Sequence, residues 1–185
     1  MSEKVLKREI LENLKKGKSK TEIYEEFSPV ADDKELRRIL ASRPAHDTSK
    51  GQRIIHKVVC WTWIFVFMVE LLSLFDLFVN FDIKVLASFA ITTYLLVQLW
   101  RFNGDVLLPS IIWLTIGIFN NLRELANIPK DDIDYEAIVI FSWSYTFIMI
   151  IAIGLTSLVR KKVFGYYNWF KPAINDQDQI IFQEK

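Results

Sequence analysis

The feature that most constrains this sequence is a series of four long apolar stretches. They cover residues 58–79, 85–100, 106–125 and 137–159. The first contains only two charged side chains, Glu70 and Asp76, and as a helix it is long enough to cross about 30 Å of hydrocarbon. The connections between the stretches are short, which favours antiparallel packing of successive helices. We therefore predict an all-α, polytopic membrane protein with four transmembrane helices.

A soluble bundle of buried apolar helices is the alternative interpretation. Such a bundle needs polar side chains on its outer surface, and these four stretches leave too few of them. We therefore expect the lipid bilayer to be the main partner of residues 58–159. The second stretch is short, so Lys84 and Arg101 at its two ends must reach toward the membrane surfaces.

The charged flanks of the four stretches predict an orientation. Acidic residues dominate the flanks on one side, where Lys84 and Lys130 also lie. The flanks on the other side carry the basic residues Lys50, Arg53, Lys57, Arg101, Arg160, Lys161 and Lys162. Because Lys and Arg accumulate on the cytoplasmic side of membrane proteins, we expect a multi-pass protein of the cell's inner (plasma) membrane with both termini in the cytoplasm.

The N-terminal part has a different composition and predicts a small separate domain. Residues 1–57 hold 14 of the 23 Lys and Arg and 10 of the 22 Asp and Glu. Residues 1–43 contain three amphipathic helical patterns, with a capping box at Ser19 and Glu22 and another helix cap at Asp32. We expect a cytosolic three-helix domain over residues 1–43, followed by a basic juxtamembrane linker over residues 44–57.

Two interpretations of this N-terminal domain are possible. Residues 17–27, GKSKTEIYEEF, look like the start of a generic helix-turn-helix unit. The next helix, however, begins with acidic residues, at Asp32, Asp33 and Glu35. These carboxylates would repel phosphate, which argues against nucleic acid as a partner. We expect instead that Tyr24, Arg37 and Arg38 bind a cytosolic protein or a second copy of the chain, because so small a core is marginal alone.

Glu70 is the polar residue that most needs an explanation. It lies about 18 Å along its predicted helix, near the middle of the bilayer, where a lone carboxylate would cost several kcal/mol. Among the residues at this depth, we predict that Thr93 and Tyr145 form the polar site together with Glu70. Further hydroxyl groups there belong to Thr92, Tyr94, Thr115, Ser144 and Thr146. Glu70 is then either an ion or proton site, or a neutral hydrogen-bonding group that joins helices or subunits.

A second polar group is expected near the outer boundary of the membrane. Asp76 and Arg123 fall at similar depths on the first and third helices, which predicts a salt bridge between them. Asn120 and Asn121 lie close to Arg123 in sequence, so these residues could form a polar vestibule. Ordinary half-solvated helix ends are the alternative interpretation of this cluster.

The C-terminal part, residues 160–185, is expected to form an interfacial segment and a tail. Residues 164–172, FGYYNWFKP, are rich in aromatic side chains that favour the membrane interface. The residues after Pro172 show no clear hydrophobic period. We expect them to form a flexible tail or a short edge strand.

No catalytic motif accompanies these features. A glycine-rich phosphate loop, a nucleophile elbow and an HExxH metal motif are missing from the sequence, and His46 and His56 lack companions for a metal site. We therefore expect no enzyme activity, no metal and no cofactor.

Three functions remain. The first is an integral membrane scaffold or anchor whose cytosolic domain mediates partner binding or homo-oligomerisation. The second is an oligomeric channel, pore or transporter in which Glu70 lines the pathway. The third is a membrane-tethered DNA-binding regulator, against which the acidic start of the third helix argues.

Overall fold

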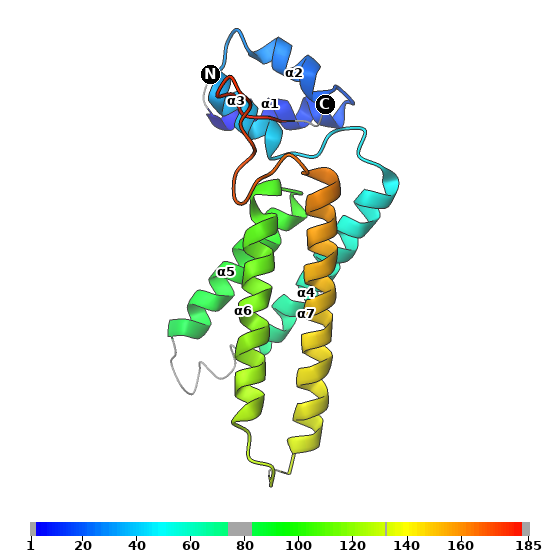
Figure 1. Ribbon diagram of the computed structural model, residues 1–185, viewed down its shortest axis with the longest axis vertical. Helices are drawn as coiled ribbons and strands as arrows, with labels where there is room; N and C mark the ends of the chain where they lie inside the picture. Colours follow the sequence, from blue (N-terminus) through cyan, green and yellow to red (C-terminus); the bar gives the residue numbers. More distant parts are fainter. Residues whose placement is uncertain (1–2, 74–82, 132, 183–185) are drawn as a thin grey trace.

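The structure, a computed structural model, describes residues 3–73, 83–131 and 133–182 and is helical throughout its main elements. Four long helices form a bundle: α4 (Lys50–Ser73), α5 (Ile83–Trp100), α6 (Leu107–Ala126) and α7 (Tyr135–Val163). Three short helices lie at one end of it: α1 (Glu3–Lys15), α2 (Lys20–Phe27) and α3 (Asp33–Ala41) (Figure 1). Within the described ranges there is no β-strand, which confirms the all-α prediction.

The three short helices have an apolar core of their own. Residues at helical spacing on each of them are buried together: Leu6, Ile10, Leu14, Ile23, Phe27, Leu36, Ile39 and Leu40. The predicted capping box is present, since the Ser19 side chain accepts from the Glu22 amide and Glu22 accepts from the Ser19 amide. Asp32 caps α3 by a single hydrogen bond, since its side chain accepts from the Glu35 amide (2.9 Å). Gly17 follows α1 with a φ of 95°, a left-handed conformation that favours glycine.

The connection to the bundle is shorter than the linker that we predicted over residues 44–57. Helix α4 already begins at Lys50. The reason is a capping box that the prediction missed: the Gln52 amide donates to Ser49 Oγ (3.3 Å), and the Ser49 amide donates to Gln52 Oε1 (3.0 Å). The basic residues up to Lys57 therefore form the first two turns of α4 rather than a loop.

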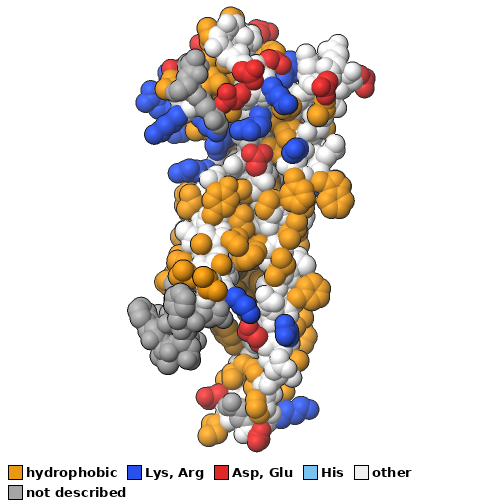
Figure 2. Space-filling view, turned by 90° about the vertical axis from the view of Figure 1, so that its left-hand side faces the viewer, with side chains coloured by type: hydrophobic (Ala, Val, Ile, Leu, Met, Phe, Trp, Pro, Cys, Tyr) orange, Lys and Arg blue, Asp and Glu red, His pale blue; other side chains and the backbone are white. Residues whose placement is uncertain are grey.

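The four bundle helices are long and apolar enough to cross a membrane. Helices α6 and α7 run side by side along their whole length, whereas α5 packs mainly on α4 and diverges from α6 away from the short helices (Figure 1). Large apolar side chains such as Phe119, Trp143 and Phe147 point outward and are exposed. Hydrophobic side chains cover the middle of the bundle, and charged side chains gather mainly around the short helices, with a few more toward the opposite end (Figure 2).

The C-terminal segment is folded rather than a flexible tail, and isolated bridges take the place of the short edge strand that was the alternative prediction. Residues 164–182 turn back over the short helices (Figure 1), with two isolated antiparallel bridges, Tyr167 to Pro172 and Ile174 to Ile180. Tyr166 and Tyr167 are buried rather than laid along a membrane surface, while Trp169 is exposed. We call α1 to α3, residues 42–49 and this segment together the head.

A buried lysine fastens the segment to the head. Lys20 is only 3% exposed, and its ammonium donates to the Tyr166 hydroxyl (2.9 Å) and to the Phe182 carbonyl (2.8 Å). The Tyr166 hydroxyl in turn donates to the Ala41 carbonyl at the end of α3 (2.8 Å). Burial lowers the pKa of Lys20 from 10.5 to about 7, although the charge of Asp47 opposes this shift. Burial of the charged Lys20 amine in the head therefore costs free energy.

The low pKa of Lys20 predicts a pH-dependent stability. Between pH 7 and 10.5 the unfolded chain binds this proton more tightly than the folded chain, so the free energy of unfolding should rise with pH by up to about 1.4 kcal/mol per unit. We expect denaturant titrations of the full chain in detergent micelles at pH 7, 8 and 9 to show this rise. The variant Lys20→Met should lack it; an equal rise in both proteins would contradict the assignment.

The end of α3 and the C-terminal segment share a second apolar core with the bundle, and Gly104 lies at its tightest point. The Gly104 amide donates to the Ser42 carbonyl (3.0 Å), which joins the start of η2 (Gly104–Val106) to the end of α3. A Cβ atom at Gly104 would lie 2.6 Å from the ring of Phe164. That ring is itself enclosed by Phe102, Tyr166 and Tyr167, so it has no room to move.

We predict that Gly104→Ala lowers the free energy of unfolding by about 1–3 kcal/mol through overpacking at this junction. Gly154→Ala is the matched control, because a Cβ atom at that position in α7 meets nothing within 4 Å. Thermal unfolding in micelles provides the comparison. Equal midpoints for Gly104→Ala and the wild type would show that the Phe164 ring is not fixed.

Candidate functional site

An open cavity of about 330 Å³ lies between all four helices and contains a few polar side chains. Glu70 enters it from α4, Ser88 from α5, Asn120 from α6 and Tyr145 from α7. The remaining wall is mostly apolar and includes Val66, Leu114 and Met149. The cavity exists because α5 contacts α6 only weakly, so its end near Lys84 leaves space beside α6.

Glu70 is the end point of a chain of hydrogen bonds across three helices. The Trp113 indole nitrogen on α6 lies 2.8 Å from Thr92 Oγ1 on α5, and Thr92 Oγ1 lies 2.9 Å from Glu70 Oε1 on α4. The Ser88 hydroxyl approaches the same carboxylate oxygen at 3.4 Å. Thr92 is completely buried, so water does not compete for its hydroxyl group.

The direction of these hydrogen bonds follows from the donor groups. An indole N–H only donates, so Thr92 accepts from Trp113 and its own hydroxyl proton is left for Glu70. Glu70 Oε1 therefore acts as an acceptor. The other carboxylate oxygen, Oε2, is buried and has no hydrogen-bond partner among the described residues. Oε2 is thus the atom at which a proton or a bound cation would be held.

A buried carboxylate oxygen without a partner is costly, because an unpaired charge loses its hydration. A metal ion needs several oxygen ligands, and no group of three or more His, Cys, Asp or Glu suited to a metal occurs in the described part of the chain. A proton needs only one oxygen atom. Oε2 alone is therefore sufficient for reversible protonation of Glu70.

The two partners selected from the sequence have different positions. Thr93 does not contact Glu70: its hydroxyl donates to the Phe89 carbonyl of its own helix (2.7 Å). The adjacent residue Thr92 takes that place, because one helical step turns the side chain by about 100°. Tyr145 does line the cavity with Glu70, and its ring stacks on Phe141 at 6.2 Å.

The sequence prediction included Thr92 among the hydroxyl groups at this depth, but it missed Lys84, Ser88 and Trp113 as residues of the site. Lys84, Ser88 and Thr92 are spaced by four residues and share one face of α5, and Lys84 and Ser88 line the cavity wall. This polar stripe in an apolar helix is a signal that could have identified the site. Trp113 carries no comparable signal, because a tryptophan in an apolar helix usually packs against its neighbours.

The predicted outer salt bridge lies partly outside the described residues. Asp76 falls in the range 74–82, so its pairing with Arg123 stays a prediction, and Arg123 is exposed on α6. The two asparagines do not form one vestibule. Asn120 lines the cavity, whereas Asn121 donates to the Ser142 carbonyl (3.0 Å) and to Thr146 Oγ1 (2.9 Å) and so joins α6 to α7.

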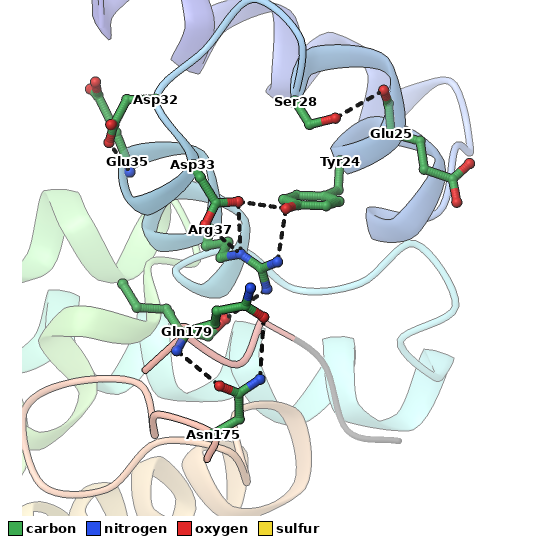
Figure 3. A network of polar contacts seen from close by, with 10 residues as sticks. Tyr24, Glu25, Ser28, Asp32, Asp33, Glu35, Arg37, Asn175 and Gln179 are labelled. Atoms are coloured by element: carbon green, nitrogen blue, oxygen red, sulfur yellow. Dashed lines mark hydrogen bonds and ion pairs between the residues drawn. The ribbon is translucent and has the colours of Figure 1, made fainter. Parts of the chain in front are cut away.

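The residues predicted to bind a partner in the head contact the chain's own C-terminal segment (Figure 3). Arg37 donates to Asp33 (2.9 Å) and to the Tyr24 hydroxyl (2.8 Å), and it approaches the Ile180 carbonyl at 3.5 Å. Its guanidinium also lies 5.6 Å from the Phe182 ring, which stacks on Tyr24 at 5.4 Å.

These contacts stabilise the charged form of Arg37. Burial lowers the pKa of Arg37, but the hydrogen bonds that Arg37 donates to Asp33 and Tyr24, together with their charges, outweigh burial and raise the pKa. Arg38 lines a neighbouring hollow of about 660 Å³ between α3 and the C-terminal segment. Two of the three predicted residues, Tyr24 and Arg37, therefore already serve an intramolecular contact.

Comparison with protein-family models, curated proteins and solved structures finds no match for this chain. Its class is defined by the fold alone: a helical protein with four helices that are long and apolar enough to span a membrane.

The hydrogen-bond chain predicts a difference between two adjacent threonines. Thr92→Val would leave the Trp113 indole and Glu70 Oε1 without their shared partner, and we expect it to lower the free energy of unfolding by about 1–2 kcal/mol. Thr93→Val removes a hydroxyl that bonds only within its own helix and should cost less than about 0.5 kcal/mol. Denaturation in detergent micelles measures both values. Equal losses of stability in the two variants would contradict the series of hydrogen bonds from Trp113 to Glu70.

Proposed function

We propose that this chain is a multi-pass membrane protein that transports protons, or couples proton binding to the transport of another solute, through Glu70. The observation that carries the proposal is the unpartnered Oε2 atom of Glu70 in a cavity that all four bundle helices line. The hydroxyl groups of Ser88 and Thr92 point at the other carboxylate oxygen, Oε1. Hydrogen bonds of this kind stabilise the ionised form of a carboxyl group. A carboxylate held in this way in an apolar layer can accept and release a proton.

Membrane insertion is supported by the outer surface of the bundle. Exposed aromatic and aliphatic side chains cover all four helices, and a soluble protein rarely exposes so large an apolar area. The head and the basic residues around it lie at one end of the bundle (Figure 2). We propose that this end faces the cytoplasm, in accordance with the positive-inside rule.

Two kinds of transport path are compatible with this proposal. A single four-helix unit has room for the cavity but not for a continuous channel, so the path would form at the contact between subunits or open in turn to each side.

Proton flux in reconstituted liposomes tests this function. We expect wild-type protein to collapse a pH gradient that a dye inside the vesicles reports, and Glu70→Gln to reduce the initial rate at least tenfold. Glu124→Gln is the matched control, since Glu124 is an exposed glutamate near the end of α6, and it should keep the rate within about twofold. Flux that is unchanged in Glu70→Gln, or absent from the wild type, would overturn the proposal.

A scaffold function of the head is the second proposal. It is favoured by the rigid attachment of the head to the bundle, since Arg43 Nη1 donates to the Arg101 carbonyl (2.9 Å) and the Tyr167 hydroxyl donates to Asp105 (2.6 Å). A fixed head can present a surface to a cytosolic protein or to a second copy. The surface around Tyr24 and Arg37 would become available only after displacement of the C-terminal segment.

A further inference from the structure

A second hollow, of about 410 Å³, lies where the head meets the bundle, and its charged lining is entirely basic. Helix α1, the connection after α3, the start of α4 and the end of α5 all contribute to it. Its cationic side chains are Lys15, Arg43, Arg53, Lys57 and Arg101, and no Asp or Glu belongs to its lining. Like charges around one concave site repel each other, and a bound anion reduces this repulsion.

Arg43 is the innermost of these cations and is incompletely paired. One of its terminal nitrogens donates to the Arg101 carbonyl, but its Nε atom is buried and has no hydrogen-bond partner among the described residues. Burial lowers the pKa of Arg43, and the charge of Arg101 adds to this effect, while Asp105 opposes it. Asp105 is already bound by the Tyr167 hydroxyl. An anion in the hollow would supply the missing acceptor and charge.

The surroundings of the hollow indicate what kind of anion fits. Lys57 and Arg101 are exposed at its rim, and Trp61 lies one helical turn beyond Lys57, while Trp100 directly precedes Arg101. The two indole rings are 64% and 58% exposed and contact each other edge to face at 6.3 Å. Exposed indoles beside basic side chains are typical of the headgroup level of a membrane. The ligand should therefore carry a phosphate at one end and apolar chains at the other.

We propose that this hollow binds the phosphate of an anionic lipid headgroup, with Arg43, Lys57 and Arg101 around the phosphate and the lipid chains along Trp61 and Trp100. This site is separate from the Glu70 cavity and does not depend on the proton function. Bound lipid would join the head to the bundle at a place where protein contacts leave a hollow. The lipid would thus be a structural partner of the junction between them.

Native mass spectrometry of the full chain in neutral detergent tests the site. The protein is titrated with phosphatidylglycerol, with phosphatidylcholine of the same chain length and with inorganic phosphate, at an ionic strength of about 0.15 M, where charges beyond about 8 Å are screened. We expect phosphatidylglycerol to bind most tightly. The double variant Lys57→Gln with Arg101→Gln should weaken its binding roughly 30-fold, because each basic group near a membrane surface contributes roughly a fivefold factor.

The control variant also removes two positive charges at the end of the bundle near the head. Lys161→Gln with Lys162→Gln changes two exposed residues at the end of α7 that lie outside the hollow, and it should keep the affinity within about twofold. Equal losses in both double variants would overturn the site and leave only general charge attraction. Equal affinity for the two lipids would overturn the role of the anionic headgroup. Saturation by inorganic phosphate without lipid binding would assign the site to a soluble anion instead.

Discussion

One requirement organises this structure: each polar group among the apolar helices must find its hydrogen bonds inside the protein. Most hydroxyl groups of the bundle meet it locally: Thr93, Thr115 and Ser144 each donate to a carbonyl one turn earlier in their own helix. Thr92 and Asn121 meet it by joining neighbouring helices. His56 Nδ1, Trp63 Nε1, Ser110 Oγ and Glu70 Oε2 do not meet it, because these buried atoms have no partner among the described residues. Of these, Glu70 is the exception that lines the cavity. The function proposed for the bundle rests on that exception.

The same requirement explains why the head is attached rigidly. Lys20 and Tyr166 are polar groups within an apolar contact, and each satisfies the other, together with the carbonyls of Ala41 and Phe182. The core around Phe164 then continues from the head into the bundle without a break. A change at the head can therefore reach α4 and α5 through packed side chains. Such a connection would let a partner or a lipid at the head influence the Glu70 cavity.

Local features of this fold were predictable from the sequence, and contacts between distant segments were not. The long apolar helices and the cap at Ser19 follow from patterns within a few residues. Glu70 stood out because a carboxylate in an apolar stretch is rare. Its partner Thr92 could not be told from Thr93, since that choice depends on how α5 is rotated against α4. The folded C-terminal segment depends on side chains more than 100 positions away, such as Lys20, and has no period of its own.

The central claim is that Glu70 binds and releases a proton within the bundle. Infrared difference spectroscopy on the protein in lipid bilayers measures this directly, because a protonated carboxyl group has a C=O stretching band that a carboxylate lacks. The account predicts a band that appears as the pH is lowered, is absent from Glu70→Gln and shifts in Thr92→Val, where the hydrogen bond to Oε1 is lost. A band that persists unchanged in Glu70→Gln, or no titrating band in the wild type, would contradict it.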